Sequence, residues 1–198
     1  MAEFGDRGFR GATLKTIAAA AGVSVGLVQH HFGTKDGLRA ACDERVVDLV
    51  RMKVAMLEDG TLTDPRSLAA LMAMAPQVQH YLSRALVEDS PGIGEMVSII
   101  MDLTEGFLTA NFADRFDPDA QKTRDTAAVM TAINTSTMVL QPHLARRMGV
   151  VAFSEEALTR IGMATLDAWE AVSEFTHTDF WSDLRSAIDA QVPHEKEI

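Results

Sequence analysis

Several side chains in the first 40 residues have the chemistry to recognise DNA if helices present them together. The outward face of an expected helix over residues 24–31 carries short, amide or imidazole side chains: Val25, Gly26, Gln29 and His30. Side chains of this kind can approach the edges of bases in a major groove. Hydroxyl and ammonium groups suited to phosphate contacts accompany them, on Thr13, Lys15, Ser24 and Lys35.

The elements that must position these groups have the pattern of a helix-turn-helix between residues 14 and 32. Ile17 and Ala21 lie four residues apart and form an inward face, and Ala18 is small where a second helix crosses closely. Gly22 suits a left-handed turn position. The remaining inward residues are Val23 in the turn and Val28 and Phe32 on the second helix. Taken alone, this pattern fits an ordinary helical hairpin equally well.

Helix signals dominate the whole chain, and no stretch alternates as a strand does. Capping residues, prolines and glycines divide it into expected helices, with Thr13, Ser24 and Thr34 as N-caps. Pro76 predicts a kink, and Pro142 and Gly149 bracket a short connecting segment. The sequence therefore predicts an all-α protein of about nine helices. The expected ranges are 13–22, 24–31, 34–58, 65–88, 91–113, 119–140, 154–175 and 179–191.

Charge is distributed unevenly along the chain. The formal net charge of −10 argues against nucleic acid as a partner when taken as an average. Residues 1–40, however, hold five basic and three acidic side chains, whereas residues 41–198 hold thirteen basic and twenty-five acidic ones. A head of charge +2 and a body of charge −12 leave DNA binding open at the head.

Composition and motifs exclude several other classes of protein. Cys42 is the one cysteine, which excludes an internal disulfide and favours a reducing cytoplasm, and a buried apolar role for it is favoured over a redox switch. No apolar run reaches the roughly 18–20 residues of a membrane span, and no secretory leader opens the chain. His30 and His31 are adjacent on a helix and chelate a metal poorly. Phosphate-loop, dinucleotide, zinc-protease and nucleophile-elbow motifs are absent. We therefore expect neither catalysis nor a cofactor or metal.

The residues flanking the helix-turn-helix decide between these interpretations. Three consecutive segments closely resemble the TetR family of bacterial transcriptional regulators. They are Gly8-Phe9-x-x-Ala12-Thr13, Ile17-Ala18-x-x-Ala21-Gly22-Val23-Ser24-x-Gly26 and His31-Phe32-Gly33-Thr34-Lys35-x-x-Leu38. The resemblance covers about residues 4–45. It implies a homodimer with a DNA-binding head over residues 1–45 and a ligand-binding and dimerisation body over residues 46–198. Ligand binding in the body would reposition the two heads and release operator DNA.

The resemblance also implies roles for individual residues. Thr13, Lys15 and Lys35 would contact phosphates or bases, Val25, Gly26 and Gln29 would lie in the groove, and His31 would contact the backbone of the DNA. The sequence departs from the family in two ways. Gln29 stands where the family commonly has Tyr, which exchanges a phosphate contact for an amide able to read adenine. The family also has about ten more residues before the position of Phe4, so we expect the native chain to start earlier.

The body offers a candidate dimer face. The expected helix over 154–175 carries a stripe of mostly small residues that permits a close approach of another helix. Ala127, Ala128, Thr131 and Thr135 would complete this face from the preceding helix. Packing within one chain is the alternative. The stripe comprises Ala157, Ile161, Ala164, Thr165, Ala168 and Val172.

The body also offers a candidate pocket for a hydrophobic or aromatic effector. Methionine lines adaptable cavities, and Asn134 would be a costly core residue without a partner. Such stripes are more often plain core, and that alternative stays open. Nearby, Tyr81-Leu82-x-Arg84-Ala85-Leu86 followed by Ser90-Pro91 resembles an actinobacterial subset of the family. The candidate pocket residues are His80, Tyr81, Met101, Phe107, Met130, Asn134, Met138 and Trp169.

The sequence therefore predicts a cytoplasmic, ligand-responsive repressor that binds a near-palindromic operator as a homodimer. The alternative is a helical protein that binds a small molecule or a partner and has lost operator binding, which the departure at Gln29 favours.

Overall fold

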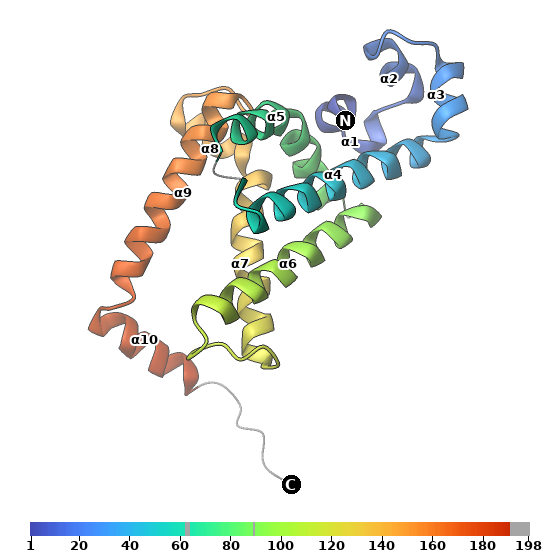
Figure 1. Ribbon diagram of the computed structural model, residues 1–198. Coiled ribbons are helices and arrows are strands. Elements are labelled where there is room, and N and C mark those ends of the chain that lie inside the picture. The colour runs from blue at the N-terminus through green and yellow to red at the C-terminus, as the bar shows by residue number, and fades with distance from the viewer. Residues whose placement is uncertain (62–63, 89, 191–198) are drawn as a thin grey trace. The chain divides into compact units, whose positions relative to one another are not determined.

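A computed structural model describes residues 1–61, 64–88 and 90–190 of the 198-residue chain. The described residues form ten α-helices and no strand, which confirms the all-α prediction (Figure 1). They divide into two compact units, Met1–Ala157 and Leu158–Ile198. The helices are α1 (Ala2–Gly11), α2 (Leu14–Ala20), α3 (Val25–Phe32), α4 (Lys35–Glu58), α5 (Pro65–Val87), α6 (Pro91–Asn111), α7 (Gln121–Val139), α8 (Gln141–Met148), α9 (Glu155–Phe175) and α10 (Asp179–Asp189).

Side-chain caps set the starts of α2, α3 and α4. The Thr13 hydroxyl accepts the backbone N–H of Thr16 at 3.1 Å, and the Thr16 hydroxyl accepts that of Thr13, so the two residues form a capping box. Ser24 and Thr34 cap α3 and α4 in the same way, by accepting the N–H groups of the third residues on. These three predicted caps are confirmed. They fix α2 and α3 as a short, well-defined pair at the N-terminal end of α4.

One hydrophobic core joins the first six helices. Phe4 of α1, Ala18 of α2 and Val28 of α3 are buried against α4, and Tyr81 and Met96 extend the same core into α5 and α6. A smaller cluster of Leu108, Phe116 and Ala127 ties α6 to α7, which run side by side (Figure 1). The head helices are therefore packed directly on the body helices of the first unit.

Three residues predicted to face inward lie partly in solvent, and one of them is Ala21, which follows the last residue of α2. Val23, in the turn between α2 and α3, is 38% exposed, and Phe32, the last residue of α3, is 40% exposed. Val28, in the middle of α3, is buried as predicted. The inward face of the helix-turn-helix is thus narrower than its sequence suggests.

One expectation from the proline positions needs correction. The segment bracketed by Pro142 and Gly149 is not a plain connection but the helix α8, since Pro142 lies in the first turn, where a missing N–H costs nothing. Gly149 ends α8 in a left-handed conformation, with φ 71°. Pro76 lies inside α5, as expected from the sequence.

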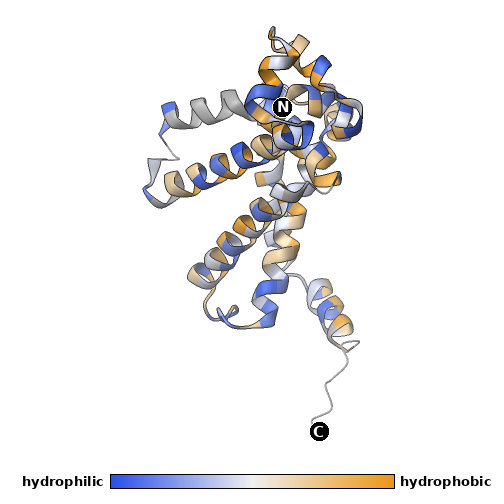
Figure 2. Cartoon of the chain, turned by 90° about the vertical axis from the view of Figure 1, so that its right-hand side faces the viewer, coloured by the Kyte–Doolittle hydropathy of each residue, from blue (hydrophilic) through white to orange (hydrophobic). Residues whose placement is uncertain are grey.

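The second unit consists of most of α9 together with α10. Phe175 at the end of α9 packs against Phe180 and Trp181 of α10, with ring centroids 5.8 Å apart in both pairs. Among the described residues, no helix is both long and apolar enough to cross a membrane, and Figure 2 shows polar residues spread along the helices.

Candidate nucleic-acid interface

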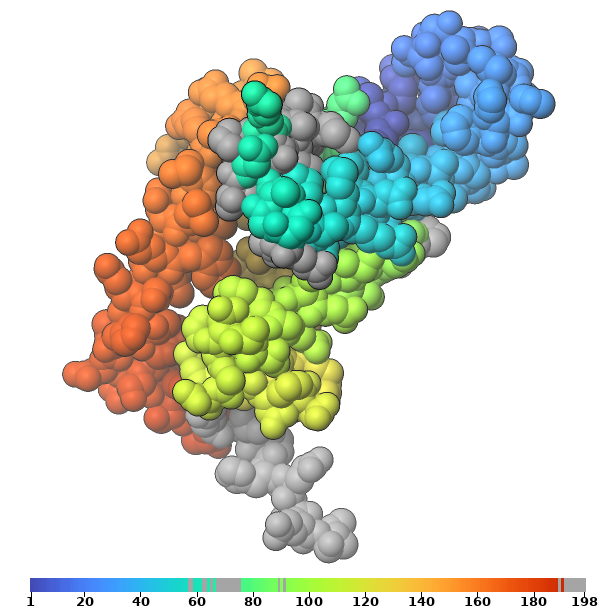
Figure 3. Space-filling view, viewed as in Figure 1, coloured from blue at the N-terminus to red at the C-terminus, as the bar shows by residue number. Residues whose placement is uncertain are grey.

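The surface of α3 presents most of the residues expected to read bases. Gly26, Gln29, His30 and His31 are exposed, and Figure 3 shows α3 on the outer surface of the head in that view. Val25 is half-buried and packs against the core, so its side chain contributes less to this surface than the sequence suggested. Gly26 lies in the first turn of α3 and has no side chain to cover the backbone. A methyl group added there would meet only the Ser24 hydroxyl, at 3.9 Å.

Leu27 belongs to the same surface, and the sequence analysis missed it. Its side chain is 44% exposed between Gly26 and the buried Val28. A helix advances by about 100° per residue, which turns Leu27 to the same side as His30 and away from Val28. The sequence signal that could have found Leu27 is this angle between successive residues. An exposed apolar side chain is of the type that can contact the methyl group of thymine.

The residues expected to contact phosphates differ in how free they are. Thr13, Lys15 and Ser24 are exposed, and Thr13 and Ser24 accept backbone N–H groups as caps at the starts of α2 and α3. Lys35, in contrast, is half-buried. Its ammonium group donates to the carbonyl oxygens of Phe9 at 2.7 Å and Ala12 at 3.1 Å.

The ring of Phe9 contacts two cationic side chains near the end of α1. The Lys35 Nζ and the Arg39 guanidinium carbon each lie 4.4 Å from the centre of the Phe9 ring. Carbonyl groups at the end of a helix carry partial negative charge, so the Lys35 ammonium is well placed to stabilise α1. In this structure Lys35 therefore joins α1 to α4.

The candidate pocket residues do not share one environment. Met101, Met130 and Met138 are half-buried, whereas Phe107 is 51% exposed and Asn134 is exposed. Trp169 is in the second unit, and its side chain is 37% exposed. Asn134 is thus not the buried polar residue that the sequence suggested. That description fits Gln141, which is 1% exposed and whose Nε2 has no hydrogen-bond partner among the described residues.

Tyr81 is a core residue with a specific polar contact. It is 3% exposed, and its hydroxyl donates to Oδ1 of the buried Asp43 of α4 at 2.5 Å. Burial, together with the negative charge of Asp43, raises the pKa of the Tyr81 phenol well above its usual range. Asp43 also accepts from the Ser90 hydroxyl and, at 3.4 Å, from the Gly92 N–H. The two residues Tyr81 and Ser90, which belong to the segment singled out in the sequence, therefore both donate to one buried carboxylate.

His80 lies between the head and the body of the first unit. Its ring stacks on Phe153 with centroids 4.4 Å apart, and a methyl group added to Gly5 of α1 would approach the ring to 2.9 Å. Burial lowers the pKa of His80, and nearby Arg84 lowers it further, while Asp6 at 3.5 Å opposes the shift. The imidazole is therefore held mainly in its neutral form.

A groove of about 470 Å³ opens beside Asp43, between α4 and the start of α6. Its walls carry both signs of charge, from Arg39 and Arg51 and from Asp36, Asp43, Glu44 and Glu95. Within the described part of the chain, no group of three or more His, Cys, Asp or Glu residues is arranged to hold a metal ion. Cys42 is buried, as expected, and burial raises the pKa of its thiol.

The expected dimer stripe is divided by the structure. Ala157 is fully buried, Ile161 and Thr165 are half-buried, and Ala164 and Ala168 are exposed. Val172 is 46% exposed. Ala127 and Thr131 of α7, which were expected to complete the face, are buried within the first unit. The outward apolar residues of α7 are instead Val129 and Ile133.

Comparisons with known proteins agree with this helix-turn-helix. Residues 1–42 match the model of the family described as bacterial regulatory proteins, tetR family. Over 101 residues the chain is 42% identical to the HTH-type transcriptional regulatory protein RaaS of Mycobacterium tuberculosis, a match that covers 50% of this chain and 44% of that protein. Over 67 residues it is 39% identical to the HTH-type transcriptional regulator BetI of Paraburkholderia phytofirmans, covering 33% of this chain and 34% of that one. The matched stretches span less than half the length of these relatives. The N-terminal head therefore matches the tetR family of bacterial regulatory proteins.

Proposed function

We propose that the protein is a transcriptional regulator, acting as a repressor, which binds a near-palindromic operator as a homodimer and is released by a small hydrophobic or aromatic effector. The observation that carries this proposal is the exposed face of α3, where Gly26, Gln29 and His30 lie together on a capped helix of a tetR-family head. We further propose that residues 1–45 form the head and residues 46–198 the body.

The shape and charge of the head support major-groove binding. Gly26 lets the backbone of α3 approach the DNA closely, and the amide of Gln29 can pair with the N6 and N7 groups of adenine. Lys15, Thr13 and Ser24 lie on exposed positions of α2 and of the two caps, where phosphate contacts would fix the orientation of α3. The positive head and the acidic body would together restrict DNA to this face.

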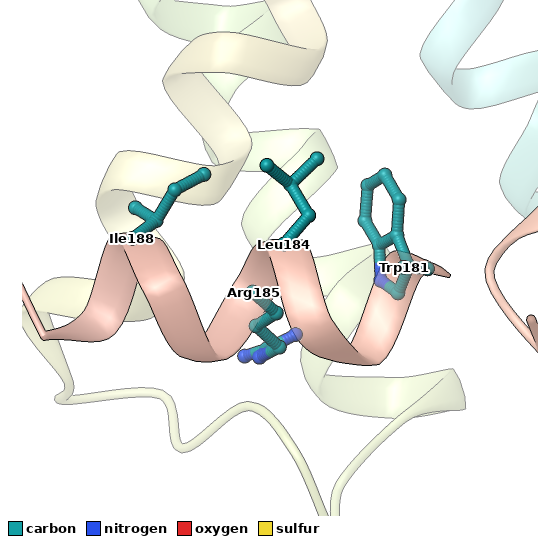
Figure 4. Close-up of a pocket in the computed structure, with 4 residues that line it drawn as sticks. All are labelled: Trp181, Leu184, Arg185 and Ile188. Carbon is teal, nitrogen blue, oxygen red and sulfur yellow. The ribbon is translucent and has the colours of Figure 1, made fainter. Parts of the chain in front are cut away.

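Exposed apolar surface on the second unit supports the homodimer. Figure 4 shows the side chains of Trp181, Leu184 and Ile188 rising from the same side of α10, with Arg185 on another side. They line a shallow pocket of about 130 Å³, and Leu184 and Ile188 are 41% and 57% exposed. Exposed apolar faces of this kind mark surfaces that associate. With the small residues Ala164 and Ala168 of α9, this face would make the dimer contact.

Buried polarity in the body supports an effector with a hydrogen-bond acceptor. Gln141 uses its Oε1 to accept the Phe153 N–H at 3.0 Å, which leaves its Nε2 without a partner among the described residues. A buried amide donor without an acceptor is costly, so an acceptor on a bound molecule would be favoured. A library of hydrophobic compounds should raise the melting temperature of the protein, and a library without any such effect would contradict the effector.

A pair of glycine substitutions tests DNA binding by α3. Gly26→Glu puts a negative charge on the exposed face of α3 and should abolish the gel shift with the DNA upstream of the protein's own coding region. Gly94→Glu is the matched control, because Gly94 is also exposed, on α6, with open space around it. Loss of binding by both variants, or by neither, would contradict the assignment of α3.

Gln29→Ala refines the same test. It should leave binding measurable but relax the preference at one base pair, which competition with single-base variants of the duplex would reveal. If the wild-type protein shifts no duplex at all, the alternative holds: a helical protein that binds a small molecule or partner without an operator. The Lys35 ammonium forms its hydrogen bonds within the protein, and this observation favours the alternative.

A further inference from the structure

The junction between α5 and α6 is bonded to two helices of the head at once. Three of its residues, Glu88, Ser90 and Gly92, make these bonds, and we call them the α5–α6 anchor. Glu88 contacts α1, and Ser90 and Gly92 contact α4. These contacts join body helices to the two head helices that flank the helix-turn-helix.

The bond to α1 occurs at a break in that helix. Gly8 has φ 68° and ψ 170°, which takes the chain out of helical geometry. The N–H of Phe9 donates to Oε2 of Glu88 at 3.0 Å. A methyl group on Gly8 would lie 2.6 Å from the other carboxylate oxygen, so a larger residue would displace the end of the Glu88 side chain, and the positive φ itself favours glycine.

The bonds to α4 converge on the buried Asp43. Its carboxylate accepts from the hydroxyl of Ser90, which is 1% exposed, and from the N–H of Gly92. A methyl group on Gly92 would lie 2.4 Å from Cβ of Asp43, an atom next to the backbone of α4, so this approach requires glycine. A glycine therefore lies at each of the two places where the anchor meets the head, Gly8 beside Glu88 and Gly92 beside Asp43.

Arg39 closes the arrangement into a ring of contacts. Its guanidinium donates to the Ser90 hydroxyl at 2.7 Å and to the Glu88 carbonyl at 3.5 Å, and it also packs over the Phe9 ring. The contacts run from α1 to the anchor, from the anchor to α4, and from α4 back to α1. Loosening one link should therefore loosen the others, as expected for a cooperative network.

We propose that the α5–α6 anchor locks α1 and α4 to each other and to the body, so that a change at the α5–α6 junction repositions the head as one piece. The link to DNA affinity rests on the proposed function, whereas the locking of α1 to α4 does not.

Hydrogen exchange on the full-length protein without DNA tests the lock itself. Ser90→Ala removes no atom that touches α1, yet it should accelerate exchange of the α1 amides, including that of Phe9, by about tenfold. Amides of α7 serve as an internal reference, because global destabilisation would accelerate them equally. The matched control is Ser98→Ala, since Ser98 is exposed and its hydroxyl contacts only the Gly94 carbonyl of its own helix. Exchange of α1 at the control's rate in Ser90→Ala would overturn the proposal.

A second pair of variants covers the case in which Ser90→Ala fails to fold. Glu88→Ala changes an exposed residue and should accelerate exchange at the start of α4 as well as in α1. Gly94→Ala is its folded reference, because nothing lies near that position. Acceleration in Glu88→Ala confined to α1, with α4 unchanged, would equally overturn the lock.

DNA affinity separates this proposal from the proposed function. With a duplex that the wild-type protein binds, Ser90→Ala should bind about tenfold more weakly than Ser98→Ala, because α3 is carried by a loosened head. Equal affinity in the two variants, with α1 loosened, would overturn the coupling to DNA. A wild-type protein that binds no duplex would contradict the proposed function, while the exchange rates would still decide the lock.

Discussion

Two lysines of the head differ in their surroundings. The Lys35 ammonium donates to two carbonyl groups at the end of α1. Lys15 lies on the exposed surface of α2, where the proposed function has it contact DNA. Replacing each lysine by alanine should therefore have different effects: on stability at Lys35 and on DNA binding at Lys15.

Lys35→Ala should lower the free energy of unfolding by about 1–3 kcal/mol, because two charge-assisted hydrogen bonds are lost. Lys15→Ala, the matched control, should change it by less than about 0.5 kcal/mol. In DNA binding, Lys15→Ala should weaken all duplexes alike and reduce the slope of log K against log salt by about 1. Urea denaturation and a salt titration measure the two effects. Equal stability of the two variants would refute the internal role of Lys35.

His80 gives a prediction about pH. Burial lowers its pKa in the folded protein, so as the pH falls below about 6.5 the unfolded chain takes up a proton first. The free energy of unfolding should therefore fall as the pH drops through this region. His80→Phe keeps a ring against Phe153 but cannot titrate, and its stability should depend less on pH. Parallel curves for the two proteins between about pH 5 and pH 7 would contradict this.

Local sequence patterns predicted the residues whose side chains form hydrogen bonds with residues close by in the sequence. The caps at Thr13, Ser24 and Thr34 bind N–H groups three residues away, so their sequence signal is complete. Contacts between distant residues gave no such signal. Lys35 reaches back 26 residues to Phe9, and Tyr81 reaches Asp43 over 38 residues. Such pairs depend on packing, which composition and spacing do not specify.

At the level of elements, replacing a glycine by alanine should change stability in opposite directions at a helix end and in a helix interior. Gly149 ends α8 in a left-handed conformation, with φ 71°, while Gly94 lies inside α6 with open space around it. The sequence predicted most helices within a few residues. It missed α8 because Pro142 reads as an interruption, although proline fits the first turn of a helix.

Gly149→Ala should destabilise the protein by about 1 kcal/mol, because a side chain at positive φ is strained. Gly94→Ala should stabilise it by about 0.5–1 kcal/mol, because alanine loses less conformational entropy in a helix. Thermal unfolding of the two variants beside wild type measures both. A shift of the same sign in both variants would be incompatible with this account of the helix ends.

The whole molecule combines a tetR-family head with a helical body whose apolar surfaces are exposed in a single chain. The resemblance in residues 4–45 predicted the head, and the family match over residues 1–42 confirms it. The body was less predictable, because its candidate residues have the same types whether they line a pocket, a dimer face or a core. Ala127 and Thr131 illustrate this, since both are buried within the first unit.

A substitution on α10 tests the homodimer. Leu184→Glu puts a charge on the apolar face of α10 and should convert the proposed dimer to a monomer in sedimentation experiments, because burying a carboxylate in the proposed contact is costly. Ser182→Glu is the control, as Ser182 is an exposed polar residue of the same helix. A Leu184→Glu protein that still sediments as a dimer would exclude this face from the contact.

The central claim is that α3 of two protomers reads DNA, and a hydroxyl-radical footprint on the upstream region tests it most directly. We predict two symmetric protected patches over a near-palindromic sequence. Their centres should lie about one helical turn apart, roughly 34–36 Å, or somewhat more. Protection should disappear with Gly26→Glu and persist with Gly94→Glu. Uniform cleavage by the wild-type protein, or a footprint that survives Gly26→Glu, would contradict the account.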